Sequence, residues 1–451
     1  MRRSSIRHPE GVDPTSSAAP GTATTPAPAS ILRPALVYVV LFGAAGAYLP
    51  YISIFLASTG LDLGSIGALI GLYAAVSLVA APSWGAIADA VGDVRGPVLV
   101  AAVLSTLSIG LLGIAASPLT VAIAIALLAA SYAGIIPMVD SRAVRLVGQR
   151  ERFGIARAPG SAAFVVVAFA TGALLASTGP RGMFLVYAPL TALIGVSAWL
   201  LLGRSGSSRP ATRATAGARP ERMSVSTLAG QALAGLAPGA ILGVLRAPRL
   251  GPFFVAAVLI WTSHAALQGF VSLRVTGLGG DATTVAAVWS LGAILEVFLM
   301  SAFPLLAGRF GAARLVVVGA FGFAMRALIT AAATDPVLIV LASLFGGVGF
   351  SFVYVGTVTW VAATVDRRVQ ATAQGIFTGT ANGIGAIGGS VLGGAIGAAL
   401  GLPVLFGVAA AGYALGGVTA WLAVGRGSSG QARDAGEGST GQAREAARPG
   451  A

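Results

Sequence analysis

Arginine is distributed very unevenly along this chain. The sequence contains 28 lysine and arginine residues, and every one of them is arginine. When the chain is divided into its long apolar segments, all but three of these arginines fall in the tails and in every second connection. The exceptions are Arg181 and Arg274, in short connections on the other side, and Arg326, inside an apolar segment. Because basic residues collect in the cytoplasmic loops of membrane proteins, this pattern predicts a multi-pass protein of the inner membrane with both termini in the cytoplasm.

The composition supports a membrane location. Hydrophobic residues make up 56% of the chain and charged residues 10%, with a mean hydropathy of +0.87, whereas soluble domains carry about 25% charge. The formal net charge of +13 follows from the loop arginines, so we expect the lipid bilayer, and no nucleic acid, as a partner. The chain has no cysteine and 2 histidines, which excludes disulfides and thiolate chemistry and leaves too few ligands for a metal site.

Twelve segments have the length of about 20 apolar residues that a membrane-spanning helix needs. They form two groups of six, near residues 35–58, 65–88, 97–115, 118–139, 158–178 and 182–203, and near 252–275, 283–306, 314–333, 337–363, 371–398 and 402–425. The predicted organisation is a disordered cytoplasmic tail (1–33), an N-terminal six-helix bundle (34–203), a basic cytoplasmic linker (204–250), a C-terminal six-helix bundle (251–425) and a second disordered tail (426–451).

Two stretches need a further argument. Residues 1–33 carry arginines and a Pro/Ala/Thr/Ser-rich stretch, but the next apolar segment is too long for a signal peptide and no small-residue cleavage site follows it. Residues 223–245 are uncharged and long enough to span, yet glycines and Pro238 interrupt them. A thirteenth span would also send the arginines of the second half outside, so we place this stretch on the cytoplasmic surface.

A glycine-containing loop motif follows the second predicted span. It consists of Gly85, Asp89, Gly92 and Arg95, and a weaker copy after the eighth span keeps the spacing of its last Gly and Arg. The motif resembles the signature loop of the major facilitator superfamily. That resemblance covers all but the tails and linker, and it implies an all-α integral membrane fold of twelve transmembrane helices in two pseudo-symmetric six-helix bundles. It also implies that the four residues form a cytoplasmic latch, whereas Asp93 is interpreted as ordinary charge in the turn.

Further residues resemble one branch of that family, related to lactose permease, nucleoside:proton symporters and phenylpropionate permeases. They are Pro137-Met-Val-Asp140, Gly154-Ile-Ala-Arg157 with Gly160-Ser161, Glu296, Arg326 and Ala373-Gln374-Gly375. The resemblance implies that Asp140, Arg157, Glu296 and Arg326 serve substrate binding and proton coupling. Pro159 replaces the aromatic residue often found at that position, and no familiar sugar-binding set is complete, so the resemblance does not identify the substrate.

Glu296 and Arg326 lie deep inside the eighth and ninth predicted spans. Counting from the ends of these spans places both roughly 18 to 20 Å deep, so we expect them to meet near the midplane. An isolated charge at this depth costs at least about 2.5 to 3.5 kcal/mol, which favours a partner and a functional pathway. In one interpretation Glu296 accepts the proton and Arg326 is its charge partner; in the other, the two form a static ion pair.

Two further polar pairs are candidates. Asp140 and Arg157 are predicted at the cytoplasmic ends of the fourth and fifth spans, either as a pair or as ordinary interfacial charge. His264 lies at midplane depth in the seventh span, with Gln268 one turn later on the same face. Histidine titrates near neutral pH, so His264 is either a substrate-binding residue or a buried neutral histidine.

Three more residues are candidates for substrate binding. They are Tyr48 and Tyr51 in the first span and Asn382 in the eleventh. Aromatic residues near helix ends also form interfacial belts, which is the alternative interpretation for the tyrosines. The eleventh span is rich in glycine, a pattern that favours close helix packing.

These observations together predict a secondary active transporter. We expect alternating access of the two bundles around a small organic solute, through proton-coupled symport, with the proton gradient as energy source and no cofactor. Proton-antiport efflux of a drug or metabolite is the main alternative, although the glycine-rich Gly-Pro motif of drug exporters is missing from the fifth span. A non-transporting membrane sensor is a remote alternative. The sequence contains no hydrolase or phosphate-binding motif, so we expect no enzyme, and we expect a monomer.

Overall fold

The computed structural model describes residues 29–147, 150–203, 246, 250–365, 377, 379 and 383–423. The regular elements in these ranges are helices. The first half contains α1 (Ala29–Tyr48), α2 (Ile52–Ser58), α3 (Leu63–Val91), α4 (Arg95–Ile114), α5 (Pro118–Tyr132), α6 (Ile135–Val147), α7 (Arg150–Thr178), the short 3-10 helix η1 (Pro180–Gly182) and α8 (Met183–Leu201). The second half contains α11 (Leu250–Gly277), α12 (Ala282–Phe310), α13 (Ala312–Ala332), α14 (Pro336–Thr364), α16 (Gly385–Leu400) and a last helix, Leu402–Ala423.

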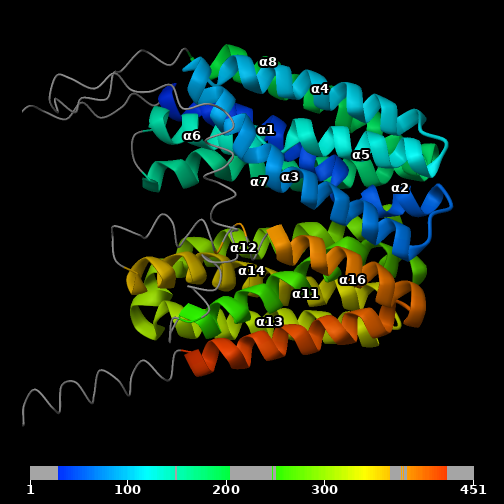
Figure 1. Cartoon of the computed structure of the whole chain (residues 1–451), viewed down its shortest axis with the longest axis vertical. Helices are drawn as coiled ribbons and strands as arrows, with labels where there is room; N and C mark the ends of the chain where they lie inside the picture. Colours follow the sequence, from blue (N-terminus) through cyan, green and yellow to red (C-terminus); the bar gives the residue numbers. More distant parts are fainter. Residues whose placement is uncertain are drawn as a thin grey trace, which may run out of the picture.

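The helices form two bundles that lie side by side (Figure 1). The N-terminal bundle contains α1 to α8, drawn from blue to green, and the C-terminal bundle contains α11 to the last helix, drawn from green to red. At one end of the molecule, here called the terminal face, α1 begins and the last helix ends. The opposite end is called the distal face. The arrangement confirms the predicted all-α fold of two helical bundles.

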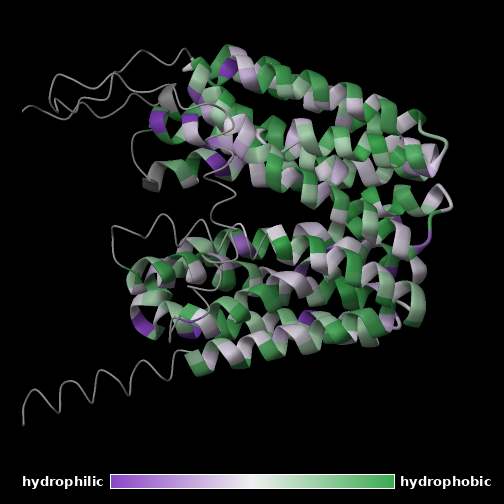
Figure 2. Cartoon of the chain, in the orientation of Figure 1, coloured by the Kyte–Doolittle hydropathy of each residue, from purple (hydrophilic) through white to green (hydrophobic). Residues whose placement is uncertain are grey.

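Eleven helices of the described chain are long and apolar enough to cross a membrane. The shorter α16 belongs to the eleventh predicted segment, 371–398, most of whose earlier residues lie outside the described ranges. Hydrophobic residues cover most of both bundles, while hydrophilic residues gather mainly near the terminal face (Figure 2). Large apolar side chains such as Leu107 and Leu305 are 66% and 80% exposed, as expected where lipid is the solvent. The protein is therefore a multi-pass membrane protein.

Side-chain caps mark the helices that begin at the distal face. The carboxylates of Asp62, Asp281 and Asp335 accept backbone N–H groups in the first turns of α3, α12 and α14 at 3.1, 2.7 and 2.7 Å. Ser117 forms a capping box at the start of α5. These caps satisfy N–H groups that have no partner inside the helix, and a carboxylate also complements the helix dipole. The helix starts at this face are therefore set by local sequence.

Two equivalent turns support the internal repeat seen in the sequence. Gly92 ends α3 with a φ of 73°, and Gly311 ends α12 with a φ of 84°. Both angles lie in the left-handed region that glycine occupies without strain. The two glycines hold the same position in the two copies of the loop motif and both adopt a positive φ, but ψ is 6° at Gly92 and 137° at Gly311. The position of the turn is therefore repeated, whereas its full geometry is not.

The first span differs from the predicted one. α1 begins at Ala29, so the helix includes residues 29–33, which the sequence analysis assigned to the tail. Ile31 and Leu32 are apolar residues that are compatible with a helix in lipid, and they extend it beyond the predicted start. The span is then divided into α1 and α2 next to Pro50, which has no N–H group to donate.

Several predicted features lie outside the described ranges. They are residues 1–28 and 424–451 of the tails, nearly all of the linker 204–250, the Ala373-Gln374-Gly375 motif and Asn382.

The two bundles touch closely in the half of the molecule nearest the distal face. A Cβ atom on Gly67 of α3 would lie 2.7 Å from the Cα atom of Gly394 in α16. A Cβ atom on Gly172 of α7 would lie 2.8 Å from the carbonyl oxygen of Ala282 in α12. Small residues allow this approach of the backbones, as they do in other membrane helix pairs. The bundles are therefore closed against each other at this end.

Candidate functional site

A cavity with two lobes lies between the bundles. The first lobe, here called the charged lobe, has a volume of about 370 Å³ and is lined by Arg157, Glu296 and Arg326 among others. The second, here called the tyrosine lobe, has a volume of about 490 Å³ and is lined by four tyrosines and mainly apolar side chains. Both lobes share the lining residues Ala45, Leu49, Ile136, Gln268 and Trp289. The two lobes are therefore adjacent, and helices of both bundles line them.

Asp140 of α6 and Arg157 of α7 form an ion pair beside the charged lobe. Their side chains meet at 3.1 Å, between Oδ2 and Nη1. The hydroxyl of Tyr38 in α1 donates to the other carboxylate oxygen at 2.6 Å, and the guanidinium lies over the ring of Phe42 at 4.8 Å. The positive charge of Arg157 is thus balanced within the N-terminal bundle. The sequence alone left open whether these two charges pair, and it gave no indication of the contacts with Tyr38 and Phe42.

Glu296 and Arg326 line the same lobe but do not form an ion pair in the part of the chain that the structure describes. The expectation that they meet was wrong. α14 packs against both α12, which carries Glu296, and α13, which carries Arg326. On one side Ser351 of α14 donates its hydroxyl to the backbone oxygen of Glu296 at 3.2 Å. Because α14 lies between the two helices, equal depth in the membrane does not bring the two charges together.

Arg326 is buried without a counter-charge among the described residues. Its side chain is only 6% exposed, and its Nε atom has no hydrogen-bond partner there. The guanidinium packs against Gly346 of α14, where an added Cβ atom would lie 2.8 Å from Nη1. A buried charged group is costly unless it is paired and hydrogen-bonded. The guanidinium of Arg326 can therefore donate a hydrogen bond to an acceptor group of a ligand in the cavity.

His264 and Gln268 of α11 face the charged lobe, one turn apart. The Nδ1 atom of His264 lies 3.3 Å from the hydroxyl of Tyr413, and its ring packs near those of Trp261 and Phe323 at 5.3 and 5.0 Å between centroids. The Oε1 atom of Gln268 is buried and has no partner among the described residues. Gln268, which lies where the two lobes join, therefore has a polar atom left for a ligand.

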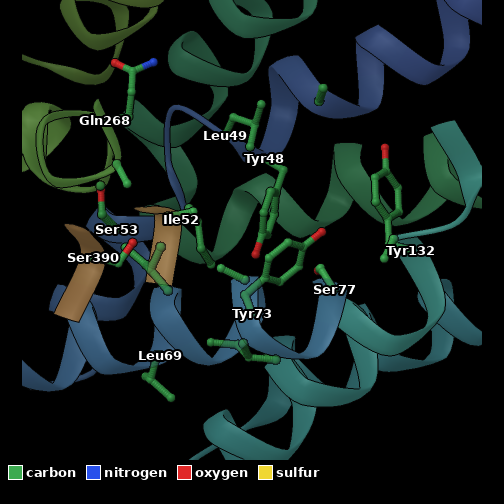
Figure 3. Close-up of a pocket in the computed structure, with 18 of the residues that line it drawn as sticks. Tyr48, Leu49, Ile52, Ser53, Leu69, Tyr73, Ser77, Tyr132, Gln268 and Ser390 are labelled. Atoms are coloured by element: carbon green, nitrogen blue, oxygen red, sulfur yellow. The ribbon is translucent and has the colours of Figure 1, made fainter. Parts of the chain in front are cut away.

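The sequence predicted only one of the four tyrosines that line the tyrosine lobe. Tyr48 was a predicted binding residue and does line this lobe, where its ring stacks on Tyr187 at 4.6 Å. Tyr73 of α3 and Tyr132 of α5 complete the set, and Figure 3 shows Tyr48 and Tyr73 side by side with Tyr132 beyond Ser77. Tyr73 and Tyr132 interrupt otherwise apolar segments, which is a signal that the sequence analysis did not use. Trp289 lines both lobes and donates its indole N–H to Ser272 at 3.1 Å.

Tyr51 does not line either lobe, in contrast to the prediction. Its side chain is fully buried, and its hydroxyl donates to the carbonyl oxygen of Ala168 at 2.6 Å and lies 3.2 Å from that of Ala282. Ala168 belongs to the N-terminal bundle and Ala282 to the C-terminal bundle. The break at Pro50 rotates Tyr51 away from the cavity, so this residue joins the two bundles near the distal face.

The ion pair of the latch motif differs from the prediction. Gly92 forms the predicted turn, and Arg95 at the start of α4 lies over the ring of Trp199 at 5.0 Å. The carboxylate that pairs with Arg95 is that of Asp93, at 2.9 Å, although Asp93 was interpreted as ordinary charge in the turn. Asp89 is exposed, without an ion pair to the described residues. Asp93 is closer to Arg95 in the sequence than Asp89 is. Because Asp93 follows the turn at Gly92, its carboxylate lies next to the side chain of Arg95. Gly85 lies one turn before Asp89 on α3.

Comparison with known proteins agrees with this architecture. A sequence model of the MFS_1 like family matches residues 31–407. The maltose permease of Geobacillus stearothermophilus is 28% identical over 360 residues, which cover 78% of this chain and 84% of the permease. The solved structure of the nucleoside transporter NupG is similar with a TM-score of 0.72 at 15% identity, over 88% of this chain and 99% of that chain.

A second solved structure supports the same fold. A POT family transporter in complex with a thioalcohol-conjugated peptide is similar with a TM-score of 0.65 at 14% identity, over 88% of this chain and 96% of that chain. At such low identities the likeness to both solved structures shows the fold alone. The matching proteins are permeases and transporters, and the match of the family model extends from the first span to the last helix.

Proposed function

Because the chain belongs to the MFS_1 like family and is a membrane transporter rather than an enzyme, we propose that it carries a small organic solute inward together with protons. The solute binds in the two-lobed cavity, and the two bundles give access to that cavity from one side of the membrane at a time. The proton gradient supplies the energy, and the protein works as a monomer without a cofactor.

One observation carries the proton coupling. Glu296 lines the charged lobe, and its carboxylate has no ion-pair partner among the described residues, although Arg157 and Arg326 line the same lobe. An ionised carboxylate that is enclosed without a partner pays a large desolvation cost. Glu296 therefore has to take up a proton, or approach a cation, before the bundles can close around the cavity. This requirement couples protonation to the conformational change.

The closed contacts at the distal face support alternating access. Gly67 and Gly172 hold the bundles together at that end, next to the cavity. Arg95, Arg309 and Arg314 lie at helix ends near the terminal face, so we assign this face to the cytoplasm of the cell and the protein to its inner membrane. The structure then represents a state whose outer end is closed. A rocking motion that separates α3 from α16 and α7 from α12 opens the cavity to the outside.

The direction of proton movement tests the proposal. The protein is reconstituted in liposomes with a trapped pH dye, and pooled sugars, nucleosides, aromatic acids and drug-like cations are added outside. Symport predicts acidification of the interior when a solute of the pool is transported. Alkalinisation would show proton antiport and would overturn the proposed direction of coupling.

Glu296→Gln tests the residue. This change keeps the size of the side chain and removes its ability to ionise, so we expect solute binding to persist while solute-driven proton entry is lost. Glu437→Gln removes the same charge from a position beyond the region matched by the family model and serves as the control. A Glu296→Gln protein that still concentrates solute with unchanged proton dependence would contradict the assignment.

A further inference from the structure

The polarity of the cavity is divided between its two lobes. The charged side chains that line it, Arg157, Glu296 and Arg326, belong to the charged lobe. Within the described chain, the tyrosine lobe is lined by no charged side chain; alanine, leucine and isoleucine alternate there with tyrosine and serine. Since the lobes share five lining residues, a single ligand can occupy both. Such a ligand would meet very different surroundings at its two ends.

The charged lobe has one cation that its own surroundings leave uncompensated. Asp140 balances Arg157 at 3.1 Å, whereas Arg326 is 6% exposed and has an unpartnered Nε among the described residues. Gly346 leaves room for its guanidinium, because a Cβ atom there would lie 2.8 Å from Nη1. Guanidinium groups bind carboxylates and phosphates through two parallel hydrogen bonds. Once Glu296 has taken up its proton, as the proposed function requires, the complement that this lobe lacks is an anionic group.

The tyrosine lobe has the properties of a site for an apolar, flat group. Tyr48 and Tyr187 already stack on each other at 4.6 Å, and Figure 3 shows the ring of Tyr73 beside that of Tyr48. Trp289 uses its N–H to bind Ser272, so the part of its side chain left for the cavity is the ring. Aromatic side chains favour stacked or edge-to-face contacts with other rings. The hydroxyl groups of a sugar would find polar partners only at the tyrosine and serine hydroxyls and at Gln268. The remaining sugar hydroxyls would face alanine, leucine and isoleucine and would lose affinity.

We infer that the solute is an amphipathic organic anion, with an acidic head group bound by Arg326 in the charged lobe and an apolar, ring-sized body in the tyrosine lobe. This inference rests on the proposed function and names its substrate class. Gln268 lies at the junction of the lobes with an unpartnered Oε1, where it accepts a hydrogen bond from a donor on the ligand. The lobe volumes of about 370 and 490 Å³ accommodate such a molecule.

Four probes test the acidic head group and the apolar body of the ligand separately. They are naphthalene-2-acetate, its neutral amide, acetate and maltose, measured by equilibrium binding to the full-length protein in lipid nanodiscs. We expect naphthalene-2-acetate to bind most tightly, with the amide weaker by about 10-fold or more, because the charge-assisted bond to Arg326 is lost. Acetate should bind weakly because it leaves the tyrosine lobe empty. Equal binding of acid and amide, or binding of maltose with none of the naphthyl acid, would overturn the inference.

Variants assign the two ends of the ligand. Arg326→Gln should abolish the preference for acid over amide, and Gly346→Ala should reduce it by displacing the guanidinium, which keeps the test informative if the first variant does not fold. Tyr132→Leu should weaken both naphthyl probes equally and leave their ratio unchanged. Arg33→Gln, which removes an exposed arginine of α1, is the matched control and should change neither. An unchanged acid-to-amide ratio in a folded Arg326→Gln protein would contradict the assignment of the head group.

The same liposomes separate this inference from the proposed function. If naphthalene-2-acetate binds and is transported without proton entry, symport is wrong and the substrate class stands. If maltose enters with protons while the naphthyl acid neither binds nor competes, the substrate class is wrong and symport stands.

Discussion

Tyr51→Phe should weaken the contact between the two bundles at the distal face. The hydroxyl of Tyr51 lies 2.6 Å from the carbonyl oxygen of Ala168, in its own bundle, and 3.2 Å from that of Ala282, in the other bundle. Phenylalanine keeps the buried ring and removes only the oxygen atom. The hydroxyl has one hydrogen, which the two carbonyl oxygens share, so the substitution deletes the longer branch of this shared bond to the other bundle without leaving a large cavity behind.

The expected size of the effect follows from that one bond. A full hydrogen bond contributes about 0.5 to 1.5 kcal/mol net. The longer branch to Ala282 contributes at most the lower end of this range, because the same hydrogen is donated to Ala168 at the shorter distance and that bond can persist when the bundles separate. Removing the hydroxyl thus favours the state in which the distal face is open. The ratio of open to closed molecules should rise roughly 2-fold.

The absence of cysteine from the sequence makes this shift measurable. Single cysteines introduced by Ala116→Cys and Thr334→Cys place a fluorophore pair on exposed positions of two distal turns, one in each bundle. Single-molecule energy transfer in nanodiscs then reports the fraction of molecules with a long distance between the dyes. We expect this fraction to increase in the Tyr51→Phe protein.

Two matched variants make the result decisive. Gly172→Ala places a Cβ atom 2.8 Å from the Ala282 oxygen, so it should open the distal face and show that the assay responds. Tyr354→Phe removes the hydroxyl of a tyrosine that is 44% exposed and should leave the distances unchanged. If Gly172→Ala shifts the distribution and Tyr51→Phe does not, the hydroxyl of Tyr51 does not hold the bundles together and the reasoning is refuted.

Three further predictions concern other contacts. Gly67→Val should also increase the long-distance fraction, because the added side chain would overlap with Gly394 across the bundles; an unchanged distribution would show that α3 and α16 separate freely. Asp140→Asn should lower the melting temperature, since it leaves Arg157 unpaired. The loss in free energy of unfolding should be smaller than the roughly 1.5 to 3 kcal/mol of a fully buried charged bond, because the side chains of Asp140 and Arg157 are 29% and 38% exposed and water screens their attraction. A double-mutant cycle with Arg157→Gln that shows no coupling would contradict this. Hydrogen bonds from the threonines in the first turn of α12 lower the pKa of Asp281, so its stabilising effect is present above the pKa of the unfolded chain and is lost as the pH falls through the lower, folded pKa. Asp281→Asn should therefore reduce the melting temperature at pH 7, and this reduction should become smaller as the pH falls below the unfolded aspartate pKa of about 3.9; a reduction that is the same at every pH would contradict the expectation.

Part of the candidate site was accessible from local sequence. Glu296 and Arg326 stood out because charged residues are rare in apolar spans and must face the interior. Asp140 and Arg157, at the ends of their predicted spans, stood out through the family resemblance. The depth of Glu296 and Arg326 followed from a count along each helix. The tyrosines of the tyrosine lobe were harder to recognise, because a single tyrosine such as Tyr73 or Tyr132 is also compatible with core packing or an interfacial belt. Only the structure shows that these side chains line the same cavity.

The sequence by itself indicated where the long apolar helices of the described chain lie. Hydrophobic length and the distribution of arginines act on each segment separately, through its contact with lipid and with the two aqueous phases. The same holds for the turns at Gly92 and Gly311 and for the aspartate caps at the distal face, since each depends on a few neighbouring residues. These features could be predicted without knowing which helices touch.

Only the tertiary structure decided which side chains meet. Glu296 and Arg326 share a depth but not a contact, because α14 packs against both of their helices. Tyr48 and Tyr51 are three residues apart, yet one lines the cavity and the other joins the bundles at Ala282. Pairing depends on the order of helices around each bundle and on how closely the backbones approach. Both are set by packing among segments far apart in the chain, which no local pattern records.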